Sequence, residues 1–341
     1  MKRYVSLLLA IIFCLPLFGC GKKQGSDTTE TTAETAPKAI IGVSLAGGDG
    51  EATLALARQF VWELTEAGYI PAVQRADRDT ATQIRQIEEM VALGAEAIIV
   101  QAADCLSLTE TADTLKSKNI PLVACDCLLM NTDALFGCVS YDYVAIGERV
   151  AREIVSAKNL DKAKDVTIEF FMGTPEDYNS LLFHQGVMNI LKPYLDSGAL
   201  VCKSGQLTFE DSYTPEDEAQ AKTLCALRLK DTYTSQTPLQ ICLAATDTVA
   251  NGCRKALEKA GFTRKNWPLI TSVGGSEKAA QAVADGYQLL TVKKDPAALV
   301  TASVETALTA IAGNPFPAET TLNNYTTDVP VLFLDTQMLD S

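Results

Sequence analysis

Short apolar runs alternate with amphipathic stretches along most of the chain from Ile40 onward. The run Ile40–Leu45 predicts a buried strand, and the amphipathic stretch Glu51–Ala67 predicts a helix after it. Such alternation is typical of βαβ units that build a parallel sheet. The other elements predicted in this half are strands at Pro71–Gln74, Ala97–Val100, Pro121–Ala124 and Phe136–Ser140 and helices at Thr80–Leu93 and Ser107–Lys118.

The same pattern then starts again, so the chain contains two successive sets of strands and helices. The strands predicted in the second set are Val166–Phe171, Ala199–Lys203, Gln240–Ala244, Leu269–Val273 and Gln288–Val292. We therefore expect an α/β protein with two similar lobes, each built on a parallel sheet. Ligands of open α/β sheets bind beyond the carboxyl ends of the strands, so two such lobes predict a cleft between them.

Polar residues follow the carboxyl ends of several of these strands. Carboxylates, an amide and an ammonium group that converge on a cleft can together bind the hydroxyl groups of a sugar, and a buried hydroxyl left without a partner costs about 1–3 kcal/mol. The alternative is that the Asp and Asn side chains cap the helices that follow. The candidate ligand-binding residues are Asp49, Asp104, Asp126, Asp177, Asn179, Asp247 and Lys294.

The N-terminal segment resembles an export signal. Lys2 and Arg3 precede the apolar run Val5–Leu17, which has the length of a signal-peptide core and is too short for a stable transmembrane helix. Leu17-Phe18-Gly19-Cys20 then matches the pattern of a bacterial lipoprotein signal. We expect cleavage before Cys20 and lipidation of its thiol, and an ordinary secretory signal is the alternative.

The segment after Cys20 is rich in Thr, Ser, Glu and Ala and cannot form a core. We therefore expect a signal peptide over 1–19 and a flexible tether over 20–38. Together they predict a protein of the cell envelope, anchored by lipid on the extracytoplasmic side of the membrane.

Charge and composition exclude several classes of function. The net charge is −13, which disfavours nucleic acid as a partner. His184 is the only histidine, so most histidine-based metal sites are excluded and a catalytic triad would have a single candidate base. We expect no metal and no cofactor. The chain has 10 cysteines, and the composition of an exported protein favours disulfides. Seven of them lie mostly in apolar runs, however, where a free thiol behaves as a small hydrophobe, and we expect most to be buried free thiols: Cys105, Cys125, Cys127, Cys138, Cys202, Cys225 and Cys242.

Four longer stretches resemble the type 1 periplasmic binding proteins of monosaccharide ABC transporters, in particular the xylose-binding and multiple-sugar-binding members. The similarity extends over about residues 40–335. The stretches that carry it are Gln83–Val91, Gly173–Asn179, Val187–Gly198 and Thr320–Asn324 with Asp328–Pro330.

This resemblance implies two lobes that close on a sugar and deliver it to an ABC permease, with three crossings near Tyr141, near Lys294–Pro296 and near Asn323–Tyr325. The lobes implied are 39–141 with 296–322, and 142–295 with 323–341, in a monomer. Asp126, Asn179, Asp247 and Lys294 match family positions that bind sugar hydroxyls.

The chain also departs from the family pattern. Ala46–Gly50 replaces an Arg and an aromatic residue, Cys127 replaces an Arg after Asp126, and Leu207 stands where an aromatic platform is expected. Gly274-Gly275-Ser276 and Tyr178 also differ from the usual motifs. These changes keep the fold and argue against xylose as the ligand.

Other functions fit the residues less well. His184 has no nucleophile motif near it. Asp104 and Asp126 could resemble the carboxylate pair of a glycosidase, but in the family that the chain resembles these positions bind sugar hydroxyls. We therefore expect no enzyme activity and no catalytic residue. A repressor reading fails because a lipoprotein signal occupies the place of a DNA-binding segment. The alternative that stays open is a sensory sugar-binding lipoprotein that signals to a histidine kinase or chemoreceptor.

Overall fold

The computed structural model describes residues 39–234, 237–318 and 320–340, which lie within one compact unit. The predicted signal peptide, Cys20 and the tether lie outside these residues. In the described part, no helix combines the length and apolar character needed to span a bilayer.

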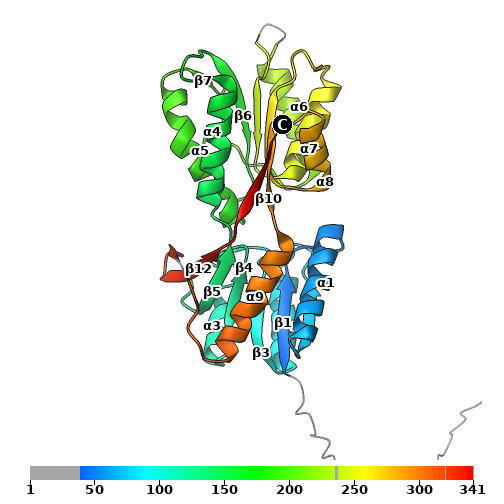
Figure 1. Cartoon of the computed structure of the whole chain (residues 1–341), viewed down its shortest axis with the longest axis vertical. Coiled ribbons are helices and arrows are strands. Elements are labelled where there is room, and N and C mark those ends of the chain that lie inside the picture. Colours follow the sequence, from blue (N-terminus) through cyan, green and yellow to red (C-terminus); the bar gives the residue numbers. More distant parts are fainter. Residues whose placement is uncertain (1–38, 235–236, 319, 341) are drawn as a thin grey trace, which may run out of the picture. The chain divides into compact units, whose positions relative to one another are not determined.

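The structure confirms two α/β lobes with mostly parallel sheets (Figure 1). The first lobe has a seven-stranded sheet, in which only β11 and β12 pair antiparallel. Its strands in spatial order are β11 (Thr320–Asn323), β12 (Asp328–Phe333), β5 (Leu135–Ser140), β4 (Leu122–Cys125), β3 (Ala95–Val100), β1 (Ile40–Leu45) and β2 (Ile70–Arg75).

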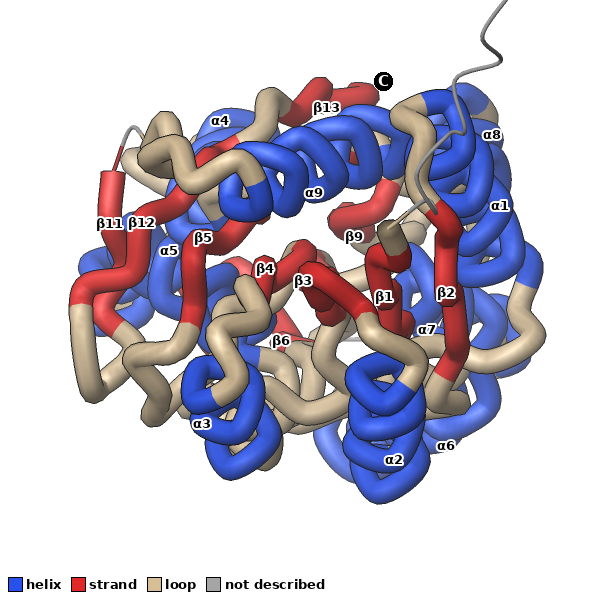
Figure 2. The backbone as a smooth tube through the Cα atoms, turned by 90° about the horizontal axis from the view of Figure 1, so that it is seen from below, coloured by secondary structure: helices blue, strands red, loops and turns tan. Residues whose placement is uncertain are grey.

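Helices cover both faces of this sheet. Figure 2 shows α1 and α9 on one face and α2 and α3 on the other. Asp79 caps the N-terminus of α2 by accepting a hydrogen bond from the Thr82 amide, which satisfies a donor that the helix cannot use itself. The helices are α1 (Glu51–Glu66), α2 (Thr80–Ala92), α3 (Thr109–Ser117) and α9 (Pro296–Ile311).

The second lobe has a six-stranded sheet, in which only β10 and β13 pair antiparallel. Its strands in spatial order are β13 (Thr336–Asp340), β10 (Leu290–Lys294), β9 (Leu269–Gly274), β8 (Ile241–Ala244), β6 (Val166–Phe171) and β7 (Leu200–Val201). Its helices are α4 (Tyr143–Lys158), α5 (Tyr178–Asp196), α6 (Glu218–Thr232), α7 (Asp247–Lys259) and α8 (Glu277–Ala284). The core strands of both sheets are almost fully buried, as their apolar runs predict.

The chain passes between the sheets after β5, after β10 and after β12. The third passage corrects the expected boundary near Asn323–Tyr325, because β12 still pairs with β5 in the first sheet. Asn324 is fully buried there and donates to the carbonyls of Leu129 and Thr132, so the β11–β12 hairpin belongs to the first lobe. The chain enters the second sheet only at Thr336.

Candidate functional site

A cavity of about 420 Å³ lies between the lobes and is lined by residues of both. Four of the seven predicted binding residues line it: Asp126 from the first lobe, and Asp177, Asn179 and Lys294 from the second. Its size is within the usual range of small-molecule sites. The cleft that the paired parallel sheets predict is therefore present, and polar groups of both lobes reach it.

Asp126 and Lys294 are linked through Tyr143, the first residue of α4. The Lys294 ammonium donates to the Tyr143 hydroxyl at 2.7 Å, and this hydroxyl donates to Asp126 Oδ1 at 2.8 Å. Lys294 Nζ also lies 3.6 Å from Asp126 Oδ2. Burial, followed by the charge of Asp126, raises the pKa of Tyr143 well above its usual value, so its hydroxyl stays protonated.

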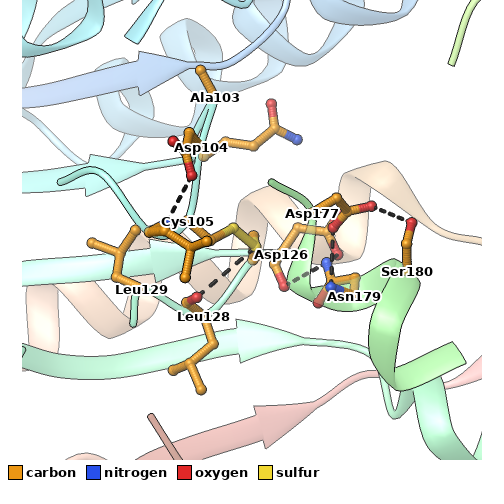
Figure 3. The surroundings of a disulfide bond; sticks show 12 residues. Ala103, Asp104, Cys105, Asp126, Leu128, Leu129, Asp177, Asn179 and Ser180 are labelled. Atoms are coloured by element: carbon orange, nitrogen blue, oxygen red, sulfur yellow. Dashed lines mark hydrogen bonds between the residues drawn. A yellow bond between two sulfur atoms is a disulfide. The ribbon is translucent and has the colours of Figure 1, made fainter. Parts of the chain in front are cut away.

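Asp177 and Asn179 lie at the start of α5 and face Asp126 from the other lobe. The side-chain amide nitrogen of Asn179, Nδ2, donates to the Asp126 backbone carbonyl at 3.2 Å and lies 3.5 Å from Asp126 Oδ1 (Figure 3). Asp177 caps α5 by accepting from the Asn179 amide N–H and the Ser180 hydroxyl. Burial, assisted by the Asp126 charge, raises the pKa of Asp177. Helix capping and cavity lining therefore coexist at Asp177.

Asp49 and Asp104 do not line the cavity. Asp49 is exposed and forms an ion pair with Arg75 within its own lobe at 2.5 Å. Asp104 accepts hydrogen bonds from the Leu106 amide and the Ser107 hydroxyl, so it shapes the loop after β3. Both side chains fit the local structural roles that Asp commonly has at loops and helix starts.

Asp247 does not line the cavity either, although Thr246 and Val249 beside it do. Its side chain is nearly buried, and its carboxylate accepts from the hydroxyls of Ser272 and Thr291 and from the Ser276 amide. All of these donors belong to the second lobe. The structure thus places Asp247 in an internal network of that lobe.

Several cavity residues were missed at the level of sequence. The sequence indicates Tyr141 only as a crossing between the lobes and does not single out Tyr143, yet both residues line the cavity, with Phe183. They supply aromatic surface that Leu207 does not, since Leu207 packs on the core instead. The signal was available, because Tyr141 and Tyr143 directly follow β5 as the other candidates follow their strands.

A second missed feature is an ion pair between the lobes. Arg78, in the loop between β2 and α2, lies 2.7 Å from Glu216 of the second lobe, and both residues line the cavity. Exposed charges of this kind carry no periodic signal in the sequence. The pair links the two lobes at the cavity.

His184 lies on α5 outside the cavity wall, and its Nε2 is 3.0 Å from the Leu207 carbonyl. Burial lowers its pKa, so the ring is neutral at pH 7 and can donate this hydrogen bond. Across the described residues no cluster of three or more His, Cys, Asp or Glu side chains could hold a metal ion.

The structure corrects the expectation of free thiols at Cys105 and Cys127, and it confirms free thiols at most of the other predicted positions. Cys105 and Cys127 form a disulfide that lines the cavity (Figure 3), although both were expected among the buried thiols. Cys105 lies in the loop after β3 and Cys127 in the loop after β4. Because these two strands are neighbours in the sheet, their loops bring the two cysteines together. The free thiols among the described residues are Cys125, Cys138, Cys202, Cys225, Cys242 and Cys253.

Comparisons with known proteins agree with this architecture. A family model described as a periplasmic binding protein domain matches residues 41–315. The multiple sugar-binding periplasmic receptor ChvE of Rhizobium radiobacter is 26% identical over 303 residues, which is 88% of this chain and 85% of that protein. The D-xylose-binding periplasmic protein of Escherichia coli (strain K12) is 28% identical over 273 residues, 80% of this chain and 77% of that protein.

A solved structure with the same fold is an ABC transporter solute-binding protein from Clostridium phytofermentans with bound β-D-glucose. It superposes with a TM-score of 0.83 and 28% identity, covering 88% of this chain and 94% of that one. The similarity therefore includes both lobes.

Proposed function

This chain belongs to the periplasmic binding protein domain family, and from that premise we propose that it is an extracytoplasmic solute-binding lipoprotein. It captures a monosaccharide or a similar polyhydroxylated ligand between its lobes and delivers it to an ABC permease. It is a binding protein and not an enzyme. The two relatives described above are likewise named as sugar-binding proteins. Cys20 carries the lipid anchor, and the protein acts as a monomer without a cofactor.

The observation that carries the proposal is the polar lining contributed by both lobes. Asp126 supplies a charged acceptor from the first lobe, and Asn179 and Lys294 supply donors from the second, all within one cavity. A ligand that bonds to both sides favours the closed arrangement over an open one, because only closure lets all contacts form together. The Tyr141 and Tyr143 rings add apolar surface for the faces of a sugar ring.

The test is a ligand screen of the soluble body by thermal shift, followed by calorimetry. We would use D-glucose, D-xylose, other pentoses and hexoses, and myo-inositol. A ligand at about 100 times its Kd stabilises the native state by about 2.7 kcal/mol. Asn179→Ala should remove that stabilisation, whereas Asp49→Asn, at an exposed site away from the cavity, should keep it. A screen in which no sugar stabilises the protein would contradict the proposal.

A sensory role is the second candidate, because one of the relatives is named a receptor. Both roles use the same closure on a sugar, so they differ in the partner of the closed form. Reconstitution in vesicles with an ABC permease encoded by a neighbouring gene would decide between the two roles. Sugar-dependent ATP hydrolysis by the transporter supports delivery, and its absence together with sugar-dependent kinase activation supports sensing.

A further inference from the structure

The cavity wall contains a covalent bond between two loops. Cys105 follows β3 and Cys127 follows β4, their Cα atoms are 6.4 Å apart, and both side chains are almost fully buried. Their disulfide is part of the surface that faces the cavity. The crosslink therefore lies where the ligand is proposed to bind, immediately next to Asp126 (Figure 3).

Asp126 has an unusual backbone conformation. Its φ is +70°, in the left-handed region that costs a residue with a side chain roughly 1–2 kcal/mol. In this conformation the Asp126 amide donates to the Val139 carbonyl at 2.8 Å, and the Ser140 hydroxyl donates to the Asp126 carbonyl. The carboxylate is then free to meet Tyr143 at the cavity. A conformation of this cost persists only where its surroundings hold it.

The crosslink also reaches the other lobe. The Cys105 amide donates to the Glu176 carbonyl of the second lobe at 3.2 Å, and the Cys105 carbonyl accepts from the Met130 amide at 2.9 Å. The disulfide thus joins the loop after β3 to the Asp126 turn after β4, and the hydrogen bond of the Cys105 amide links this loop to the Glu176 segment across the cleft. These parts come together at the cavity.

We propose that the Cys105–Cys127 disulfide is a positioning element of the binding site, which holds Asp126 in its left-handed conformation and thereby sets the affinity for the sugar. The proposal rests on the sugar-binding function proposed above. Without the crosslink the Asp126 turn can relax to more favourable backbone conformations. If the competent conformation then falls to about one tenth of the population, the apparent Kd rises about 10-fold.

The thiol of Cys125 is not expected to exchange with this disulfide. Burial raises the pKa of Cys125, which directly precedes Asp126, to about 12. The thiol, rather than the thiolate, is then its form at neutral pH, and only thiolates attack disulfides efficiently. The crosslink therefore persists in the oxidising environment of an exported protein.

The experiment compares the oxidised protein with a Cys105→Ser/Cys127→Ser double variant and with the protein reduced by a phosphine. The phosphine reduces the disulfide to two thiols and becomes a phosphine oxide that takes its oxygen from water. Calorimetry uses D-glucose, D-xylose and myo-inositol, and hydrogen exchange monitors the Asp126 amide. We expect about 10-fold weaker binding, equivalent to about 1.4 kcal/mol, faster exchange at Asp126, and recovery on reoxidation.

Two controls separate positioning from simple stabilisation. The phosphine should leave the double variant unchanged, because the remaining cysteines within the described residues are free thiols. A lower melting temperature with unchanged affinity and unchanged Asp126 exchange would overturn the proposal and leave a purely structural crosslink. Peptide mapping that finds both thiols free in the folded, unreduced protein would overturn it as well.

Failure of the function and failure of this inference give different results. If no probe sugar binds the oxidised protein, the proposed sugar-binding function is contradicted. Exchange at Asp126 then still decides the inference, since unchanged exchange after loss of the crosslink overturns it and faster exchange supports its positioning half.

Discussion

Asp126 and Asp247 hold similar places in the two lobes and have different surroundings. Asp126 follows β4 and Asp247 follows β8, each a central strand of a parallel sheet. The Asp126 carboxylate meets Tyr143, Lys294 and Asn179, which all belong to the second lobe across the cleft. The Asp247 carboxylate meets only groups of its own lobe.

The strands beside each aspartate account for the difference. Next to β8, strand β9 and then β10 present the hydroxyls of Ser272 and Thr291, which donate to the Asp247 carboxylate. Next to β4, strand β5 presents Ser140, which donates to the Asp126 carbonyl instead. The left-handed turn at Asp126 leaves its carboxylate to the cavity. A carboxylate at the end of a strand is thus available to a ligand only where its own lobe does not satisfy it.

The largest effect is expected at Asp247. Asp247→Ala would leave two hydroxyls and the Ser276 amide without their acceptor in a nearly buried site, and each unsatisfied donor costs about 1–3 kcal/mol. We expect the free energy of unfolding to fall by about 3 kcal/mol or more, measured by urea denaturation without ligand. Asp49→Ala is the matched control and should leave it unchanged. A stable variant with weakened sugar binding would instead place Asp247 at the ligand.

The converse result is expected at Asp126. Asp126→Asn keeps a residue that tolerates the left-handed conformation and removes the charged acceptor. Loss of a charged hydrogen-bond partner should weaken sugar binding by about 1.5–3 kcal/mol, roughly 10- to 150-fold. Calorimetry measures this, and the unliganded stability should change little. Equal affinities in variant and wild type would remove Asp126 from the binding site and end the comparison.

The contrast also explains what the sequence could predict. The buried strands of both sheets were predictable because apolar runs such as Ile40–Leu45 and Val166–Phe171 carry a strong signal. The shorter β11 and β13 mix polar and apolar residues, and β12 contains Pro330, so their sequence does not indicate where the third passage between the lobes lies.

The candidate site was predictable only in part, for a different reason. The strand ends identified Asp126, Asp177, Asn179 and Lys294, which do line the cavity. They could not separate Asp247 from Asp126, because the donors to Asp247 come from strands that follow it in the sequence by 25 and 44 positions. The disulfide depends on the adjacency of β3 and β4, which spacing alone does not give.

A smaller, pH-dependent effect is expected at Asp177, which faces Asp126. Burial and the Asp126 charge raise its pKa in the folded protein above the usual 3.8, so between these two values the folded state binds more protons than the unfolded state. The free energy of unfolding should therefore fall as the pH rises through this window, by at most about 1.4 kcal/mol per pH unit. Asp177→Asn, which retains a helix cap, should remove this slope.

The test is urea denaturation of both proteins across the acidic range. The sign matters here, because a carboxylate stabilised by its partners would give the opposite slope. Identical slopes in wild type and Asp177→Asn would mean that Asp177 is not destabilised by burial and by the facing charge of Asp126.

The smallest effect is expected at the ion pair between the lobes. Arg78 and Glu216 are partly exposed, with side-chain exposures of 65% and 38%, and exposed pairs contribute about 0–1 kcal/mol. Because this pair joins the two lobes, its loss should favour the open form and weaken sugar binding less than about five-fold. The Arg75–Asp49 pair has similar chemistry within one lobe and should have no effect on binding. Calorimetry of Glu216→Gln and Asp49→Asn at low and high salt measures both. The difference between the two variants should shrink at high salt, where exposed charges are screened, and a difference that persists there would show that Glu216 acts through contact with the ligand rather than through closure.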